Sequence, residues 1–456
     1  MHKIKPSFIL FLLFITVNCY AQSPVLEQYI RESIENHPSL KQQNFAIQKS
    51  LYALEEAKGL FLPTVNFNTT YSTAAGGRKI SFPVGDLVNP IYSTLNKLTP
   101  AGSPKFPEGA IPNVNEQLVP KNFYDMRLKT QMPIFNAEIK YNQKIKKQLI
   151  NVQQAEMEVF KRELVKDLKT GYFNYLKSLE AIHIYENAQT LLKETERVNR
   201  SLIKNEMALP MALIRTQNEQ SKIEADAILA ENNRKNAQAY FNYLRNQPFE
   251  TEILIDTTFR TSLSKTLIEK ESVQINNREE IQKLEAAIRV NETILAMNKA
   301  YHKPKIGGIL DIGSQGSVKD INAKNPFVLL GLSFDLPVYA GNRNNLKIKQ
   351  QEMELASLNE QEKQIKNQLL LQTEMAKNSF IASTNSLFAK NTQVETAKRY
   401  YNDVLKRYKE NQINYVELFE AQTQLTNSLL QKNIANYDNW IRFAELERAM
   451  ASFELK

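Results

Sequence analysis

The stretch GLSFDLPVYAGNRNNLKIKQQ, residues 331–351, decides the fold. It alternates apolar and polar residues as a half-buried strand does, breaks at Pro337, and then becomes polar with the spacing of a helix. The earlier stretch RLKTQMPIFNAEIKYNQKIKKQ, residues 127–148, follows the same course around Pro133. The chain therefore runs a strand through a proline–aromatic corner into a long polar helix twice.

Long helices are expected wherever glycine and proline are scarce. There is no proline between residues 134 and 209, and neither proline nor glycine after residue 341. These tracts are rich in good helix formers, and their apolar residues recur at spacings of three and four. We expect helices over residues 137–205 and 342–410, each roughly 100 Å long, with return helices of about 40 residues after them.

The two halves of the chain repeat one another. Residues 37–65 align without gaps on residues 278–306, which places Pro63 over Pro304, and Pro133 matches Pro337. A period near 200 indicates a duplicated domain rather than a solenoid. We expect a first repeat over residues 22–250 with a β-hairpin at 64–133, a linker at 251–275, and a second repeat over 276–456 with a β-hairpin at 305–337.

The expected strands carry apolar residues on one face only. In the last strand these are Val328, Leu330, Leu332, Phe334 and Leu336. Ten-residue segments of this kind are typical of transmembrane barrel strands, although a half-buried strand in a soluble sheet alternates in the same way. Four strands leave two open edges, which hydrocarbon does not tolerate. In a membrane, several chains must therefore contribute strands to one closed barrel. A barrel of eight strands from a dimer would be filled by side chains, whereas a barrel of twelve strands from a trimer leaves a pore.

The first hairpin carries about 37 residues more than the second, within residues 76–122. Its prolines and glycines argue against regular structure in that segment. Because the helix ends of the hairpin lie on the periplasmic side in the barrel interpretation, we expect a long extracellular loop there. Tyr92, Leu95 and Leu98 are apolar enough to fold over the pore mouth, so a partial lid is a further hypothesis.

Residues 1–21 have the pattern of a secretory signal peptide. A basic start and a short apolar centre precede Cys19-Tyr20-Ala21, a small-x-small cleavage site. The apolar run is too short to span a bilayer. A lipobox with Cys19 as the acylated residue is the alternative, which Asn18 fits poorly.

Several function classes are disfavoured by the sequence. The net charge is +9, but Lys and Arg are interleaved with acidic and amide residues, so we expect no nucleic-acid binding. His37, His183 and His302 lack neighbours at ligand spacing, which predicts no metal site. No phosphate loop and no nucleophile–base constellation is present, so neither a cofactor nor an enzyme activity is predicted. A soluble periplasmic coiled-coil scaffold or adaptor protein remains the alternative to a membrane channel.

The order and spacing of these features resemble those of the TolC family of outer membrane efflux channels. NHPSL at residues 36–40, the corners MPIFNAE and LPVYAGN, and VELFEAQTQL at residues 416–425 carry the resemblance across the mature chain. It implies a mainly α fold with membrane β-barrel strands, assembled as a homotrimer with a β-barrel in the outer membrane and an α-barrel in the periplasm. It further implies passive export for an inner-membrane pump through a periplasmic adaptor, either as multidrug or small-molecule efflux or as type I secretion.

The resemblance also suggests site residues. Glu417 and Glu420 match positions where the family sets acidic rings at the periplasmic entrance, and their i,i+3 spacing puts them on one helix face. An exposed face paired with Lys or Arg is the alternative. The adaptor is expected to contact the helix-turn tips, residues 202–209 and 409–415, through Met207, Leu209, Ile413 and Tyr415. The positions that match the Arg and Asp partners of the family's polar latch are Ile413 and Ala212, so a latch in this chain must be different or weaker.

Overall fold

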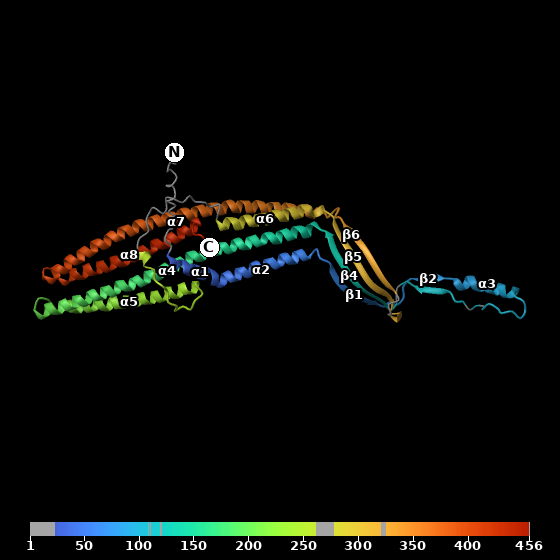
Figure 1. Cartoon of the computed structure of the whole chain (residues 1–456), viewed down its shortest axis with the longest axis horizontal. Coiled ribbons are helices and arrows are strands. Elements are labelled where there is room, and N and C mark those ends of the chain that lie inside the picture. The colour runs from blue at the N-terminus through green and yellow to red at the C-terminus, as the bar shows by residue number, and fades with distance from the viewer. Residues whose placement is uncertain are drawn as a thin grey trace, which may run out of the picture. The chain divides into compact units, whose positions relative to one another are not determined.

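The computed structural model describes residues 23–107, 109, 111–118, 121–260, 278–320 and 325–455. Within them the chain forms two compact units (Figure 1). The helical unit comprises the described residues up to Leu51, those of Lys147–Asn291, and those from Met353 onward. The sheet unit comprises Tyr52–Lys146 and Glu292–Glu352. The expected signal peptide and much of the expected linker lie outside the described residues.

Helices account for most of the described chain, as the scarcity of glycine and proline predicts. The two long helices are confirmed, because α4 has 68 residues and α7 has 67. The return helices have 34 and 36 residues, slightly fewer than expected. None of the described helices combines the length and the apolar character needed to cross a membrane. The main helices are α1 (Pro24–Asn36), α2 (Pro38–Gly59), α4 (Ala137–Lys204), α5 (Met211–Leu244), α6 (Glu279–Lys299), α7 (Arg343–Lys409) and α8 (Tyr415–Met450).

Both long helices end in the same turn geometry. Glu206 and Asn411 adopt left-handed backbone conformations, with φ of 60° and 57°. After each of them the chain closes a Schellman motif: the amide of Met207 donates to the carbonyl of Leu202 at 2.8 Å, and that of Gln412 donates to that of Arg407 at 2.9 Å. The Asn414 side chain then caps α8 by accepting from the next helical amides. The two halves of the chain therefore share the backbone conformation and the hydrogen bonding of the turn that ends each long helix.

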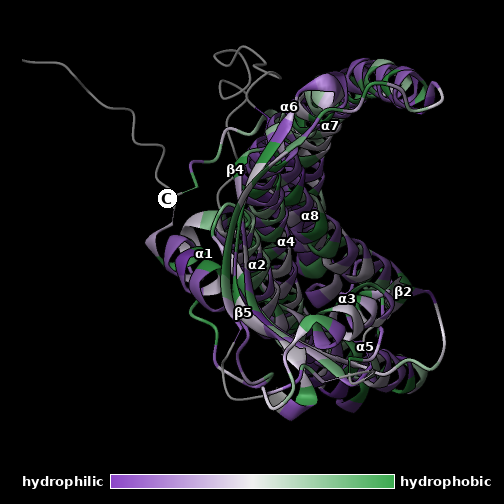
Figure 2. Cartoon of the chain, turned by 90° about the vertical axis from the view of Figure 1, so that its right-hand side faces the viewer, coloured by the Kyte–Doolittle hydropathy of each residue, from purple (hydrophilic) through white to green (hydrophobic). Residues whose placement is uncertain are grey.

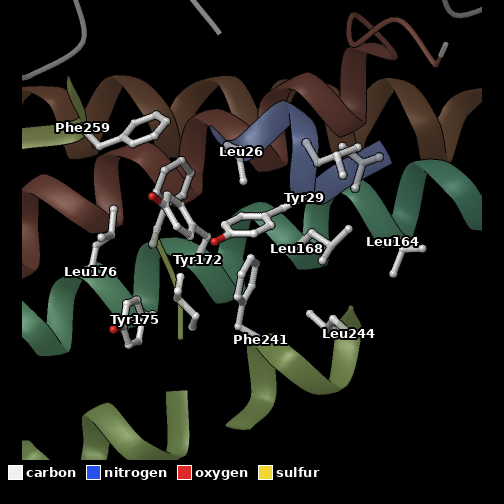
Figure 3. Packing of buried hydrophobic residues seen from close by; sticks show 14 of the residues in the cluster. Leu26, Tyr29, Leu164, Leu168, Tyr172, Tyr175, Leu176, Phe241, Leu244 and Phe259 are labelled. Atoms are coloured by element: carbon white, nitrogen blue, oxygen red, sulfur yellow. The ribbon is translucent and has the colours of Figure 1, made fainter. Parts of the chain in front are cut away.

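The core of the helical unit combines aliphatic residues with a group of contacting aromatic rings (Figure 3). Tyr172 on α4 is fully buried, with its ring 5.5 Å from that of Phe241 on α5 and 5.9 Å from that of Phe259. Its hydroxyl donates to the carbonyl of Leu254 at 2.9 Å and accepts from the amide of Asp256. Burial raises the pKa of Tyr172. These bonds satisfy a polar group in an apolar core and fix the segment that follows α5.

Helices in both units carry hydrophilic and hydrophobic residues interspersed along their length (Figure 2). Their buried positions recur at three and four, for example Leu164, Leu168 and Tyr172 on α4. This is the spacing of a helix that packs along one stripe. At Gly171 on α4 an added Cβ would lie 3.4 Å from Phe241 Cδ2, an ordinary contact distance, so α4 packs closely against α5 there.

The sheet unit contains a four-stranded antiparallel sheet in the order β1-β4-β5-β6. Its strands are β1 (Thr64–Ser72), β4 (Phe123–Phe135), β5 (Lys305–Ser317) and β6 (Pro326–Asp335). The register pairs Asn68 with Arg127, Lys129 with Asp311, and Asp311 with Leu329. The two hairpins of the duplication thus meet along β4 and β5, and β1 and β6 form the edges.

The two corner prolines behave differently. β6 ends at Asp335, two residues before Pro337, as predicted for a residue that cannot donate to a ladder. At Pro133 the same prediction is wrong, because β4 continues to Phe135. The pairing register shifts between Pro133 and Phe135, so a bulge absorbs the missing amide.

The expectation of irregular structure in the first hairpin is also wrong. Residues 76–122 contain the two-stranded ribbon β2 (Lys79–Phe82) and β3 (Val114–Gln117), and between them helix α3 (Val84–Leu98). Prolines stand at the helix boundaries, since Pro83 occupies the N-cap position and Pro100 follows the end. Only Pro90 lies inside the helix. The spacing of three and four between apolar residues in this segment therefore indicates its helix correctly, whereas its content of proline and glycine does not.

Candidate functional site

One face of the four-stranded sheet is apolar and uncovered in the single chain. Along β6 the residues of this face are 67% to 82% exposed: Val328, Leu330, Leu332 and Phe334. The register continues the face across the sheet through Ile312, Leu128 and Phe67. A contiguous apolar surface of this kind marks an interaction site or a lipid-facing surface.

The opposite face carries charge. Arg127 Nε donates to Asp125 Oδ1 at 2.9 Å, and its Nη1 lies 3.4 Å from Asp311 Oδ2 on the neighbouring strand. Lys129 stands directly across from Asp311. The predicted division into an apolar and a polar face is therefore confirmed, and it matches barrel strands with lipid outside and water inside.

Both edges of the sheet are open within the chain. β1 pairs only with β4, and β6 only with β5, among the described strands. Nine residues of β1 and ten of β6 thus each present one row of unpaired backbone groups. The chain alone does not form a closed barrel.

The sequence-predicted tip residues differ in their exposure. Met207 is 51% and Leu209 72% exposed. Ile413 and Tyr415 are partly buried, and they pack against an apolar cluster of α7 and α8 that includes Tyr408. The first tip, residues 202–209, therefore offers more free apolar surface than the second tip, residues 409–415.

Glu417 and Glu420 are both exposed near the start of α8. Glu420 lines an open groove between α5 and α8 that also includes Arg215 and Lys222. No ion pair joins Glu417 or Glu420 to a cation among the described residues, and the same part of the chain holds no cluster of His, Cys, Asp and Glu able to bind a metal.

Comparison with known proteins relates these features to one family. Residues 272–452 match the model of the outer membrane efflux protein family. The family model matches only the second half of the chain, but the likeness of fold extends further. Solved structures of outer membrane proteins superpose on 93–94% of the whole chain. Residues 272–452 are therefore similar to outer membrane efflux proteins in sequence, and the chain as a whole has the fold of the solved outer membrane channels. No curated protein matches it in sequence.

Three solved structures show the extent of the likeness. The outer-membrane channel OprN superposes with a TM-score of 0.74 at 12% identity, covering 94% of this chain and 90% of its own. VceC from Vibrio cholerae gives 0.70 at 13%, covering 93% and 95%. The MtrE channel from Neisseria gonorrhoeae gives 0.73 at 14%, covering 94% and 89%. At these identities the comparison concerns the fold of the chain.

A buried polar cluster joins the two helical hairpins near the tips. Asn199 on α4 is fully buried and donates to Thr216 Oγ1 at 2.8 Å and to the carbonyl of Ala212, both on α5. Its side-chain oxygen accepts from the hydroxyl of Tyr408 on α7. Burial raises the pKa of Tyr408. The sequence analysis missed this cluster; the one available signal was an Asn at a core position of the α4 stripe.

A second polar network lies where α8 ends. Arg448 bonds to Glu280 at the start of α6 at 2.6 Å and to Glu163 on α4 at 3.1 Å, and Arg278 bonds to Glu280 at 2.7 Å. Burial alone would raise the pKa of Glu280, but the hydrogen bonds and positive charges of Arg278 and Arg448 outweigh it and lower that pKa to about 2. These ion pairs tie the second repeat to the first within the helical unit.

Proposed function

We propose that three copies of this chain close one β-barrel and form a passive export duct from the periplasm to the cell exterior. The exposed apolar face of the sheet with its two open edges carries the proposal. Backbone groups in hydrocarbon must all be paired, so β1 of one copy pairs with β6 of the next. Four strands from each copy make a barrel of twelve, wide enough for a pore.

The long helices form the periplasmic wall of this duct. α4 and α7 are each about 100 Å long if straight. In this proposal residues 22–250 and 276–456 are the two repeats, 251–275 the linker between them, and 1–21 the signal peptide for export. Each repeat supplies one long helix and one return helix, which together form a helical hairpin. Three copies therefore contribute six helical hairpins to the periplasmic wall.

The duct depends on partners for energy. A periplasmic adaptor contacts the tips, and an inner-membrane pump drives cargo through the channel, whether small molecules or a secreted polypeptide. Met207 and Leu209 support an adaptor contact at the first tip, because they are exposed apolar groups beside a helix turn. Ile413 and Tyr415 contribute their remaining exposed surface at the second tip.

Glu417 and Glu420 are proposed to ring the periplasmic entrance. In a trimer they supply six carboxylates near one constriction, where they attract cations by the summed field. Both are exposed and neither forms an ion pair among the described residues, which supports this role. The groove that Glu420 lines also contains Arg215, and Lys222 paired with Glu219. Arg215 reduces the net charge beside Glu420, so Glu417 is expected to contribute more.

The test is assembly and conductance of the purified protein. Native mass spectrometry of the detergent-extracted chain should give the mass of three copies, and planar bilayers should show discrete conductance steps. Leu332→Arg should block insertion, because an arginine on the lipid face near mid-depth costs about 2–4 kcal/mol. Ser333→Arg, one residue along and on the other face, is the matched control and should still insert. Recovery of a folded soluble monomer from the periplasm would overturn the proposal and favour the scaffold or adaptor alternative.

A further inference from the structure

Helix α3 of the first hairpin is held in place by its polar side. Asn89 Nδ2 donates to the carbonyl of Ile111 at 2.9 Å. Asn96 Nδ2 donates to the carbonyl of Phe106 at 2.7 Å, and Asn96 Oδ1 accepts from the amide of Phe106 at 2.7 Å. Seven residues separate the two asparagines, so they lie on one helix face. That face is hydrogen-bonded to the backbone of Phe106 and Ile111 in the return segment, by which we mean the described residues within 106–113.

Other contacts fix the same arrangement. Tyr92 stacks on Phe106 with 5.2 Å between ring centroids. Gly85 is buried beneath the carbonyl of Ile111, where any side chain would collide with that oxygen. Asp86 accepts from the side chain of Asn113 at 2.9 Å. The return segment therefore covers the face of α3 that carries these residues, and the other faces stay uncovered.

The apolar face of α3 is among the uncovered ones. Its residues are 38% to 76% exposed and follow one another at spacings of three and four: Val84, Leu87, Ile91, Leu95 and Leu98. Val84, Ile91 and Leu98 are each seven residues apart, the period of a helix seam that packs against other helices. The charged residues of α3, Asp86 and Lys97, lie off this stripe. Helix α3, which hydrogen bonds on its polar side hold against the return segment, thus exposes a continuous apolar stripe to water.

A second copy of α3 fits this stripe better than a membrane surface does. Helices that lie in a membrane interface carry several Lys or Arg on their polar side, whereas α3 has one Lys and one Asp. Branched aliphatic residues at a heptad-like spacing favour association between helices. Among the described residues, the turn of the second hairpin contains a short 3-10 helix, Val318–Asp320, and no counterpart of α3. A trimer therefore contains three copies of α3.

The chain connectivity brings these copies to the junctions of the assembly. β1 is an open edge of the sheet, and only residues 73–78 separate it from β2. In the proposed barrel β1 pairs with β6 of the neighbouring copy, so each insertion starts where two copies meet. The apolar stripe therefore continues an interface that the open strand edges already require.

We propose that the three α3 helices of the assembled channel pack together through Val84, Leu87, Ile91, Leu95 and Leu98 into a three-helix bundle outside the barrel. The proposal rests on the trimer proposed above and specifies the role of its extracellular insertion. The bundle covers the apolar stripes and stands in the path that cargo takes on leaving the pore. It turns the hypothesis of a partial lid into a specific contact between copies.

Cross-linking of single-cysteine variants tests the bundle. Ile91→Cys places a thiol on the stripe, and Lys97→Cys places one off it on the same helix. The parent chain, whose sole cysteine is Cys19, gives the background. With a short trifunctional maleimide on the purified channel, Ile91→Cys should run as a covalent trimer on a denaturing gel. Lys97→Cys should accept a monofunctional maleimide but remain monomeric.

The outcomes separate this inference from the proposed function. If native mass spectrometry gives a trimer and Ile91→Cys does not cross-link, the bundle is wrong while the channel stands. If no trimer forms, the proposed function itself fails. A second measurement attaches a fluorophore to the cysteine of Ile91→Cys in proteoliposomes that contain nitroxide-labelled lipids. Quenching of the fluorescence would show that the apolar stripe contacts the membrane and would overturn the bundle. Retained fluorescence together with trimer cross-linking supports it.

Discussion

The hydroxyl of Tyr408 donates a hydrogen bond to the side-chain oxygen of Asn199, so α7 and α4 share a buried polar contact although 209 residues separate them. The amide of Asn199 is bonded to α5 in turn. Three helices from both repeats thus meet at one asparagine close to the tips.

Tyr408→Phe should loosen the tips. The change leaves the buried oxygen of Asn199 without this donor, and such a loss costs about 1–3 kcal/mol. Hydrogen exchange of residues 195–216 and 401–418 should become roughly tenfold to hundredfold faster. Tyr401→Phe is the matched control, because Tyr401 lies one heptad earlier in the same cluster and its hydroxyl makes no hydrogen bond within the described part of the chain. Equal effects of the two variants would show that the hydroxyl bond is unimportant.

Acid should weaken the helical unit through Glu280. Its pKa is lowered from an ordinary 4.5 to about 2 by Arg278 and Arg448. A carboxyl with a lowered folded-state pKa adds stability above its unfolded pKa, and that stability is lost as the pH falls toward 2. The thermal midpoint, followed by far-ultraviolet circular dichroism, should therefore drop between pH 5 and pH 2. Glu280→Gln should start lower at pH 5 and show a shallower drop; an unchanged slope would contradict the assignment.

Glu417→Gln combined with Glu420→Gln should reduce cation preference in planar bilayers. Fixed carboxylates at a constriction concentrate cations by their field, so neutralising them should move the reversal potential toward zero in a salt gradient. Glu395→Gln, an exposed change several turns before the end of α7, is the control and should leave the potential in place. A reversal potential that responds equally to both changes would mean that selectivity does not arise at the tips.

Leu209→Glu should weaken adaptor binding. Leu209 is 72% exposed, so a charge there disturbs the contact surface and leaves the apolar cluster of the second tip intact. Ile413→Glu is a poorer probe because Ile413 packs into that cluster. With a photoreactive side chain at Met207 in intact cells, the yield of adduct with a periplasmic protein should fall at least tenfold in Leu209→Glu. Leu229→Glu, exposed on α5 away from the turn, should preserve the yield.

Deletion of residues 85–112 should leave the channel assembled. The segment belongs to the insertion, and the strands of the four-stranded sheet lie outside it. Single-channel conductance should rise if the insertion narrows the exit. In intact cells, protease should cut the parent chain first within residues 76–122, because that segment is expected outside the cell. Cleavage only after lysis would reverse the proposed orientation.

Much of the fold follows from local rules in the sequence. The helices expected over residues 137–205 and 342–410 agree with α4 and α7 to within one residue at each end. The alternation of apolar and polar residues predicted which face of β6 is apolar. These features depend on neighbours in the chain, and the duplication supplies each signal twice.

The features that the sequence did not predict depend on distant partners or on competing local signals. Asn199 looked like an ordinary polar residue, since its partner Tyr408 comes from the other repeat. Glu280 and Arg448 are 168 residues apart. Helix α3 was missed because Pro90 and its flanking prolines argued against helix, while the return segment that stabilises it comes later in the chain.

The matching turns at Glu206 and Asn411 have a consequence for stoichiometry. In a trimer they present six nearly equivalent hairpin ends to the periplasm, whereas the single insertion per chain presents three equivalent features to the outside. A ring of six adaptor subunits can therefore engage the inner end with one contact each. A ligand that recognises the outer end, such as an antibody or a phage fibre, meets threefold symmetry only.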